Sequence, residues 1–166
     1  MEMTAASHTI RPAIAADVAS IHAMILELAE FENLSHEVQS SGDDLHRALF
    51  GERPVAESLV ACAGDEVIGF AIFFTHYSTF TGKPGIYLED LFVRPQYRSR
   101  GIGKQLLVRV AQTAVERGCA RYEWSVLDWN ENATRFYESC GAKMQGDWRR
   151  MRVSGDALTR LAGLSG

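Results

Sequence analysis

Residues 86–117 have the sequence IYLEDLFVRPQYRSRGIGKQLLVRVAQTAVER, and this stretch decides the fold class. Its first part, Ile86 to Val93, is rich in apolar and aromatic residues and predicts a strand that Pro95 prevents from continuing. Its last part, Gly101 to Arg117, predicts an amphipathic helix, because apolar residues recur there at helical spacing and Gly118 follows. A strand, a short glycine loop and a helix in this order indicate a sheet covered by helices.

The rest of the chain predicts further strands and helices around this centre. Helical periodicity and capping patterns indicate helices, and apolar runs between turn residues indicate strands. The predicted strands are His8 to Arg11, Ser58 to Ala63, Val67 to Tyr77, Arg121 to Leu127 and Lys143 to Val153. The predicted helices are Asp17 to Asn33, a short one opened by Ser41, Asn130 to Cys140 and Asp156 to Leu164. We therefore expect an α/β or α+β fold, a mixed sheet with helices on its faces, in a single domain over residues 1–166.

Composition narrows the classes of partner. The net charge is -4, and no run of Lys and Arg is long enough to follow a phosphate backbone, so we expect no nucleic acid. Apolar stretches such as Gly69 to Phe74 are too short to span a bilayer, and residues 1–7 lack the features of an export signal. The three cysteines and five histidines have no metal-ligand spacing. We expect reduced thiols, no metal, no membrane partner and a cytoplasmic location.

The loop Arg98-Ser99-Arg100-Gly101-Ile102-Gly103-Lys104 has the features of a phosphate site. The first N–H groups of the following helix lack intrahelical partners, and with the helix dipole they favour an anion. The two glycines remove side chains, so a pyrophosphate could approach the backbone closely, and three basic residues add charge. The Walker and dinucleotide patterns do not fit, because Gln105 and Leu106 stand where they require Ser or Thr and Gly. Short G-x-G motifs are common, so the loop alone favours phosphate binding only moderately.

Three blocks of sequence together resemble the GNAT superfamily of N-acetyltransferases, and most closely its spermidine/spermine (diamine) N-acetyltransferase branch. The blocks are Tyr87-Leu88-Glu89-Asp90-Leu91-Phe92-Val93-Arg94-Pro95, Tyr97-Arg98-Ser99-Arg100-Gly101-Ile102-Gly103, and Trp129-Asn130-Glu131 with Arg135-Phe136-Tyr137-Glu138 and Gly141-Ala142. The similarity extends from about Ile10 to Leu161. It implies a GNAT-like acyl-CoA N-acyltransferase fold, with a mostly antiparallel sheet and helices on both faces. It also implies a homodimer, which the predicted C-terminal strand could help to form.

The resemblance further implies acetyl-CoA as cosubstrate, bound at three places. The strand end Leu91-Phe92-Val93 would pair its backbone with the pantetheine arm. Asn130 would contact the arm from the other side. The pyrophosphate would be held by Arg98, Ser99, Arg100, Gly101, Ile102, Gly103 and Lys104.

The spacing of Asn130 and Tyr137 is compatible with contacts to one extended ligand. Seven residues make two helical turns, so the two side chains project from one face about 10.5 Å apart along the axis. The resemblance assigns Tyr137 as the acid that protonates the leaving thiolate, a role for which a tyrosine hydroxyl is suited. From the residues alone, the favoured interpretation is that Tyr137 packs beside Phe136 and that Asn130 caps its helix. With the resemblance the ligand roles are favoured, and Asn130 could do both.

Glu89 and Asp90 are the candidate groups for handling an amine. An alkyl ammonium has a pKa near 10.4, so only about one molecule in 10³ is neutral at pH 7, which adds roughly 4 kcal/mol to the barrier. Neighbouring strand residues point to opposite faces, so a regular strand would deliver only one of the two carboxylates unless a bulge intervenes. The resemblance links Glu89 to amine deprotonation and Asp90 to substrate binding. The alternative is an edge strand with two solvated acids.

The end of the first predicted helix supplies two further substrate residues by resemblance, Phe31 and Glu32, which would line the amine channel. Acidic residues at a helix end are more often a solvated face. The chain also departs from the polyamine enzymes before the catalytic strand, where Ser78 replaces an acid and Phe80 a tryptophan. This departure favours a shorter amine, such as a diamine, a lysine-like amino acid or an aminoalkyl thioether.

The sequence therefore predicts acetyl transfer from acetyl-CoA to a primary amine of a small cationic molecule, by direct attack in a ternary complex. One alternative keeps the chemistry but takes a protein or peptide N-terminus as acceptor. Another is a CoA-binding sensor domain without catalysis, against which the joint presence of Glu89, Asn130 and Tyr137 argues.

Overall fold

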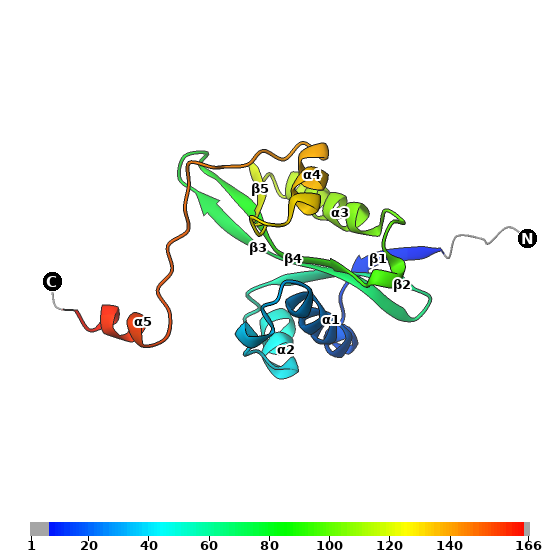
Figure 1. Ribbon diagram of the computed structural model, residues 1–166, viewed down its shortest axis with the longest axis horizontal. Helices are drawn as coiled ribbons and strands as arrows, with labels where there is room; N and C mark the ends of the chain where they lie inside the picture. Colours follow the sequence, from blue (N-terminus) through cyan, green and yellow to red (C-terminus); the bar gives the residue numbers. More distant parts are fainter. Residues whose placement is uncertain (1–6, 165–166) are drawn as a thin grey trace, which may run out of the picture. The chain divides into compact units, whose positions relative to one another are not determined.

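The computed structural model describes residues 7–164, which fall into two compact units that meet in sequence between Ser125 and Val126. The expectation that residues 1–7 lack an export signal concerns a segment of which residues 1–6 lie outside the described residues. The first unit contains a five-stranded sheet in the order β1-β2-β3-β4-β5 (Figure 1). The strands are β1 His8–Pro12, β2 Glu57–Ala63, β3 Glu66–Ser78, β4 Lys83–Val93 and β5 Arg121–Trp124. Only β4 and β5 pair in parallel, so the predicted mixed, mostly antiparallel sheet is confirmed.

Helices cover both faces of this sheet, as predicted. Helices α1 (Val18–Phe31) and α2 (Gly42–Phe50) lie on one face and α3 (Ile102–Glu116) on the other (Figure 1). Single 3-10 turns precede α1 and lie between α1 and α2 and after β4. The α1–α2 side has a buried core of helix and strand residues: Val18, Ile21, Met24, Leu45, Leu49, Val60, Cys62, Val67, Phe70, Ile72 and Phe92. No helix among the described residues is long and apolar enough to cross a membrane.

The middle of the sheet differs from the prediction in one useful way. In the β3–β4 ladder Ile72 pairs with Asp90 and Phe73 with Leu88, so Glu89 is an extra residue on β4, a β-bulge. The β4–β5 ladder stops at Leu88, immediately before the bulge. The predicted strand Arg121 to Leu127 is therefore shortened to Arg121–Trp124, because its pairing with β4 ends where the bulge begins.

The second unit contains two helices, α4 (Glu131–Ser139) and α5 (Gly155–Ala162), close to the predicted bounds. The predicted strand Lys143 to Val153 is wrong, since no strand is assigned there. A strand needs a partner for its backbone, and all described strands belong to the sheet of the first unit, in which this segment has no place. Without this strand, its predicted contribution to a dimer interface is not possible either. None of the described residues of the second unit is buried.

Candidate active site

The glycine loop forms the expected uncapped helix start. Gly101, the N-cap of α3, has a left-handed φ of 76°, and no side chain caps the helix within the described residues. The first helical bond runs from the Gln105 N–H to the Gly101 carbonyl, so the N–H groups of Ile102, Gly103 and Lys104 have no partner in the helix. Ser99 is also left-handed, with φ 63°. Two left-handed residues so close together turn the backbone into a concavity suited to an anion.

The two glycines do different jobs. Gly101 is required for its positive φ, since a Cβ there would meet nothing nearer than Gln105 Nε2 at 4.0 Å. Gly103 lies in ordinary helical conformation, where a Cβ would meet only Val93 Cγ2 at 3.8 Å. The protein therefore has room for a side chain at Gly103 and leaves that room empty. Uncapped N–H groups with free space above them at a helix start favour an anion such as a phosphate group.

Two of the three basic residues of the loop contact aromatic rings. The Arg100 guanidinium lies 5.5 Å from the ring centroid of Tyr97. The Arg98 guanidinium lies 5.4 Å from that of Phe31 and 5.3 Å from that of Phe92. Such distances are typical of cation–π contacts.

The end of β4 has an edge with no strand on it in the described sheet. Leu91, Phe92 and Val93 pair with β3 on one side, while β5 pairs with β4 only as far as Leu88. The side chains of Phe92 and Val93 are buried, so the backbone is the part left for a ligand. An extended chain with amide groups, such as pantetheine, can pair with such an edge.

The bulge gives Glu89 and Asp90 different surroundings. Glu89 is exposed, whereas Asp90 is partly covered and lies opposite Ile72, which belongs to the core under α1. Burial, and then the charges of Glu89 and Glu32, raise the pKa of Asp90 to about 6. Burial also raises the pKa of Glu32. The structure thus brings together three of the four predicted substrate residues in one electrostatic group, and it contradicts the alternative of two solvated acids for Asp90.

The remaining predicted residues lie in the second unit. Asn130 is the N-cap of α4, and its side-chain oxygen accepts a hydrogen bond from the Ala133 N–H at 3.2 Å. The capping interpretation is therefore confirmed. Tyr137 is half-buried, with its ring centroid 5.3 Å from that of Phe136. The structure thus shows both the cap formed by Asn130 and the packing of Tyr137 beside Phe136. The ligand roles of these two residues remain proposals.

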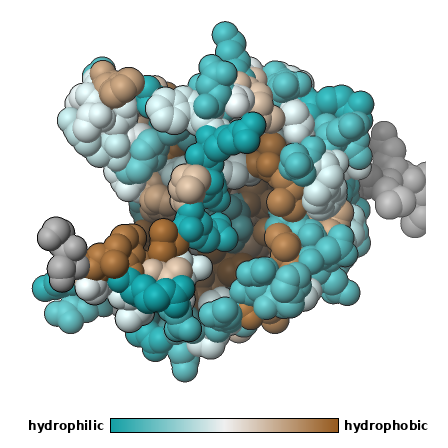
Figure 2. All heavy atoms as spheres, turned by 60° about the vertical axis from the view of Figure 1, so that its left-hand side comes forward, coloured by the Kyte–Doolittle hydropathy of each residue, from teal (hydrophilic) through white to brown (hydrophobic). Residues whose placement is uncertain are grey.

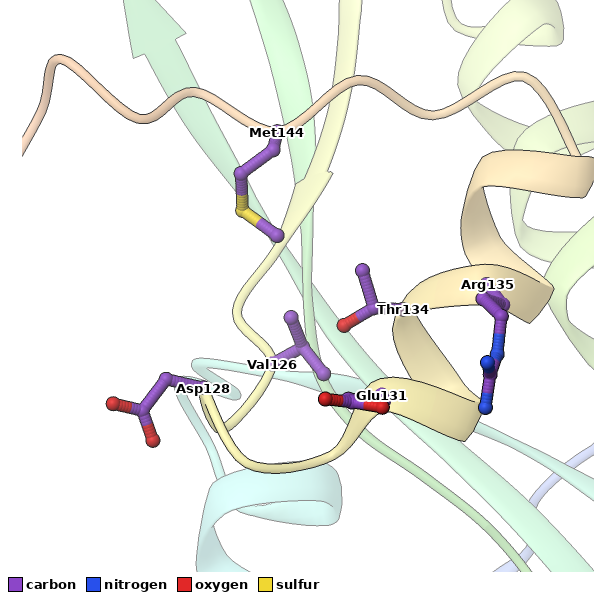
Figure 3. Close-up of a pocket in the computed structure, with 6 residues that line it drawn as sticks. All are labelled: Val126, Asp128, Glu131, Thr134, Arg135 and Met144. Atoms are coloured by element: carbon purple, nitrogen blue, oxygen red, sulfur yellow. The ribbon is translucent and has the colours of Figure 1, made fainter.

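The second unit also contains a pocket of about 400 Å³ (Figure 3). In the close-up Met144 extends toward Val126 and Thr134, and Glu131 and Arg135 project from α4. The lining also includes Asp128 but neither Asn130 nor Tyr137, so this pocket is not the predicted site. Among the described residues no group of three or more His, Cys, Asp or Glu side chains could hold a metal ion.

The two positions that depart from the polyamine enzymes lie at the end of β3, where Ser78 is its last residue, and in the following turn, which contains Phe80. Ser78 is buried, and its hydroxyl accepts a hydrogen bond from the Thr81 N–H at 3.3 Å. Phe80 is 87% exposed. Ser78 therefore has a structural role in the turn.

Sequence reasoning missed three features of the site. It did not place Arg98 between Phe31 and Phe92, because a contact between distant segments leaves no local pattern. It had no sign that Ser99 would be left-handed, a conformation uncommon outside glycine. The position of the bulge was open, although two adjacent acids in an apolar strand were a signal that regular alternation fails there.

Comparisons with known proteins agree with this geometry. The Acetyltransferase (GNAT) family matches residues 22–142. The chain belongs to the GNAT acetyltransferase family. This GNAT enzyme is 41% identical to the thialysine N-epsilon-acetyltransferase of Mus musculus, over 95% of its own length and 99% of the relative's. It is 34% identical to the L-ornithine N5-acetyltransferase NATA1 of Arabidopsis thaliana, over 92% and 86% of the two chains.

Solved structures show the same fold. An integron cassette protein from the mobile metagenome of V. cholerae has a TM-score of 0.80 and 27% identity, over 95% of this chain and 99% of that one. An aminoglycoside acetyltransferase from an uncultured soil metagenomic sample has a TM-score of 0.73 over 89% and 95% of the two chains. Its identity is 18%, so the likeness shows the fold alone. The predicted fold, family and N-acetyltransferase class are confirmed.

Proposed function

We propose that this GNAT enzyme transfers the acetyl group of acetyl-CoA to a terminal primary amine of a short diamine or lysine-like amino acid. The observation that carries the proposal is the Asp90 carboxyl, partly buried with Glu32 and Glu89 near it, on the strand whose open edge leads to the glycine loop. A partly buried acidic group attracts a cation, and its place on β4 puts the amine beside a thioester paired with the same strand. The names of the relatives, which act on thialysine and L-ornithine, support a short amine.

Acetyl-CoA binds along the β4 edge at Leu91, Phe92 and Val93 and at the glycine loop. Asn130, in the second unit, is the further cofactor residue that the family resemblance implies. Acetyl-CoA supplies the thioester and the diphosphate. In the loop, the N–H groups of Ile102, Gly103 and Lys104 face the diphosphate, Ser99 and Gly101 shape the backbone, and Arg100 and Lys104 add charge. Asn130 contributes the polar groups that its capping bond leaves available.

Glu89 and Asp90 divide the handling of the amine. Asp90 binds the ammonium form of the amine. Burial and the negative charges of Glu89 and Glu32 raise the pKa of Asp90, and a bound cation would offset the repulsion among these carboxylates. Glu89, exposed at the bulge, accepts the proton through water, which gives the neutral amine needed for attack. Phe31 and Glu32 form the wall of the amine pocket at the end of α1. The neutral amine attacks the thioester carbonyl directly in a ternary complex, without an acyl-enzyme. As the C–S bond breaks, Tyr137 donates a proton to the departing thiolate.

The test is a thiol-release assay with acetyl-CoA and a panel of amines. The panel contains thialysine, lysine, ornithine, putrescine, spermidine, an aminoglycoside and a peptide with a free N-terminus. We expect turnover with the short amines and little with spermidine or the peptide. Preference for the peptide would favour a protein N-acetyltransferase. Binding of CoA by calorimetry without thiol release from any amine would favour a sensor domain, and no binding at all would refute the cosubstrate site.

We also propose a cytoplasmic homodimer. The three cysteines are free thiols, as expected in a reducing compartment. The second unit exposes many large apolar side chains, among them Trp148 at 77% and Met151 at 91% exposure. Hydrophobic residues are visible among the hydrophilic ones on the surface drawn in Figure 2. A second copy of the chain is the partner that would cover such side chains in an enzyme of this kind.

A further inference from the structure

Arg98 connects three parts of the first unit. Its guanidinium lies over the ring of Phe31, the last residue of α1, and over the ring of Phe92 on β4. Its Nε donates a hydrogen bond to the carbonyl oxygen of Val93 at 2.8 Å. One side chain therefore joins the end of α1, the end of β4 and the start of the glycine loop.

These contacts place Arg98 next to the proposed amine pocket. Phe31 is followed directly by Glu32, and the charge of Glu32 helps to raise the pKa of Asp90. The last turn of α1 has no basic residue, and Glu32 continues it as the C-cap. A negative charge at a helix C-terminus is unfavourable, as is its proximity to Asp90, so a contact from outside the helix stabilises this end. The stack of Arg98 on Phe31 is such a contact.

We propose that Arg98 is a positioning residue of the amine pocket, which fixes Phe31 and Glu32 against Asp90 through its stack on Phe31 and its bond to Val93. The inference rests on the proposed function and changes the role that the family resemblance implies for Arg98, which was pyrophosphate binding. The Nε donor is already used on Val93, and the planar face of the guanidinium is used on two rings. Arginine is needed for this combination, because lysine has neither the planar face nor the fixed donor geometry.

The test compares Arg98→Lys with Arg100→Lys. Both variants keep the charge of the loop, and both arginines stack on aromatic rings, but the Tyr97 partner of Arg100 lies in the 3-10 turn after β4. For Arg98→Lys we expect the amine KM to rise roughly tenfold, from the weakening of two ring contacts and the loss of one hydrogen bond, with the Kd for CoA within about twofold of wild type. For Arg100→Lys we expect the reverse pattern. A weaker Kd for CoA with an unchanged amine KM in Arg98→Lys would overturn the inference, as would a lower Tm with both constants unchanged.

A double-mutant cycle with Phe31→Leu separates positioning from independent effects. If Arg98 acts through Phe31, the double variant has nearly the same amine KM as Phe31→Leu alone, whereas independent effects multiply. Full multiplication would refute the coupling.

Hydrogen exchange gives a readout that does not need activity. The amides of Glu32 and Leu34 are bonded to the carbonyls of Leu28 and Ala29, and they should exchange faster in Arg98→Lys than in Arg100→Lys. If wild type acetylates no amine in the panel, the proposed function fails, and equal exchange in the two variants would then refute the positioning role separately.

Discussion

A single carboxyl, that of Asp90, is the clearest sign of function at the scale of residues. Its pKa of about 6 in the folded chain exceeds the ordinary 3.8 because burial and two neighbouring carboxylates disfavour its charge. A group whose pKa is higher in the folded state contributes stability below its unfolded pKa and loses it as the pH rises through the folded value. The free energy of unfolding should therefore fall between about pH 4 and pH 6 on account of this residue.

Asp90→Asn should consequently stabilise the protein at neutral pH while it lowers activity. A rise in pKa from 3.8 to about 6 corresponds to at most about 3 kcal/mol. Urea unfolding of both proteins at pH 4 and pH 7.5 measures the difference, which should be present at pH 7.5 and nearly absent at pH 4. In turnover assays the amine KM of wild type should rise below about pH 6, as Asp90 gains a proton, and that of the variant should not.

Asp17→Asn is the matched control, because it should change the free energy of unfolding at pH 7.5 in the opposite direction. Asp17 is buried and paired with Arg11 at 2.7 and 3.0 Å, and hydrogen bonding to Arg11 lowers its pKa. Its stabilising contribution is present above the unfolded pKa and is lost as the pH falls, so this variant should be less stable at pH 7.5 by about 2 kcal/mol. If Asp90→Asn also loses stability at pH 7.5, the assigned environment of Asp90 is wrong.

Tyr137→Phe tests the proposed acid. Removal of one hydroxyl leaves the contact with Phe136 and should leave the Kd for acetyl-CoA unchanged, while kcat falls roughly 10²-fold through loss of proton donation. Steady-state kinetics and calorimetry measure the two quantities. Tyr87→Phe is a suitable control, since it likewise removes one tyrosine hydroxyl, which lies 2.7 Å from that of Ser125, but Tyr87 is on β4. A kcat equal to wild type in Tyr137→Phe would remove this residue from the mechanism.

At the scale of elements, the uncapped start of α3 is the proposed anion site. A substitution of Gly103 tests it, because stability and CoA affinity should change in opposite directions. Alanine is the better helix former by roughly 1 kcal/mol, and a Cβ here would make only an ordinary contact with Val93. Gly103→Ala should therefore raise the Tm and weaken CoA binding, because the new methyl group takes the space of the diphosphate.

Gly42→Ala is the control for that experiment. Gly42 begins α2, and a Cβ there would meet nothing within 4 Å. We expect this variant to keep the wild-type Kd for CoA in calorimetry, with at most a small change in Tm. If Gly103→Ala gains stability and still binds CoA as tightly as wild type, the diphosphate does not lie over Gly103.

Sequence patterns predicted most of these elements because their signals are local. The Ser41 cap of α2, for example, is an S-x-x-D pattern, and the structure shows its reciprocal bonds with Asp44. The end of β5 could not be predicted, since it depends on the bulge at Glu89 in another strand. The strand over Lys143 to Val153 was predicted from composition, but a strand forms only where a partner exists. In the candidate site, the family resemblance indicated which residues matter. The contacts that raise the pKa of Asp90 and hold Arg98 were visible only in the structure.

At the scale of the whole molecule, the buried residues are distributed unequally. Every residue classed as buried in the described chain lies in the first unit, whose sheet has cores on both faces. The described part of the second unit exposes its large apolar residues instead, including Met144, Trp148, Met151, Leu158 and Leu161. Hydrophobic burial is the main favourable term in folding, so a segment with so little of it needs an additional partner. This is the physical basis for expecting self-association.

The proposed homodimer should therefore depend on the second unit and be separable from the fold of the first. In sedimentation equilibrium we expect wild type to have twice the 18.4 kDa mass of the chain. The double variant Trp148→Asp, Met151→Asp should shift it toward the monomer, because two charges cannot enter an apolar interface without several kcal/mol of desolvation cost. Phe80→Asp is the control, since Phe80 is equally exposed but lies in the β3–β4 turn of the first unit. A monomeric wild type, or a dimer that survives the double variant, would exclude the second unit as the interface.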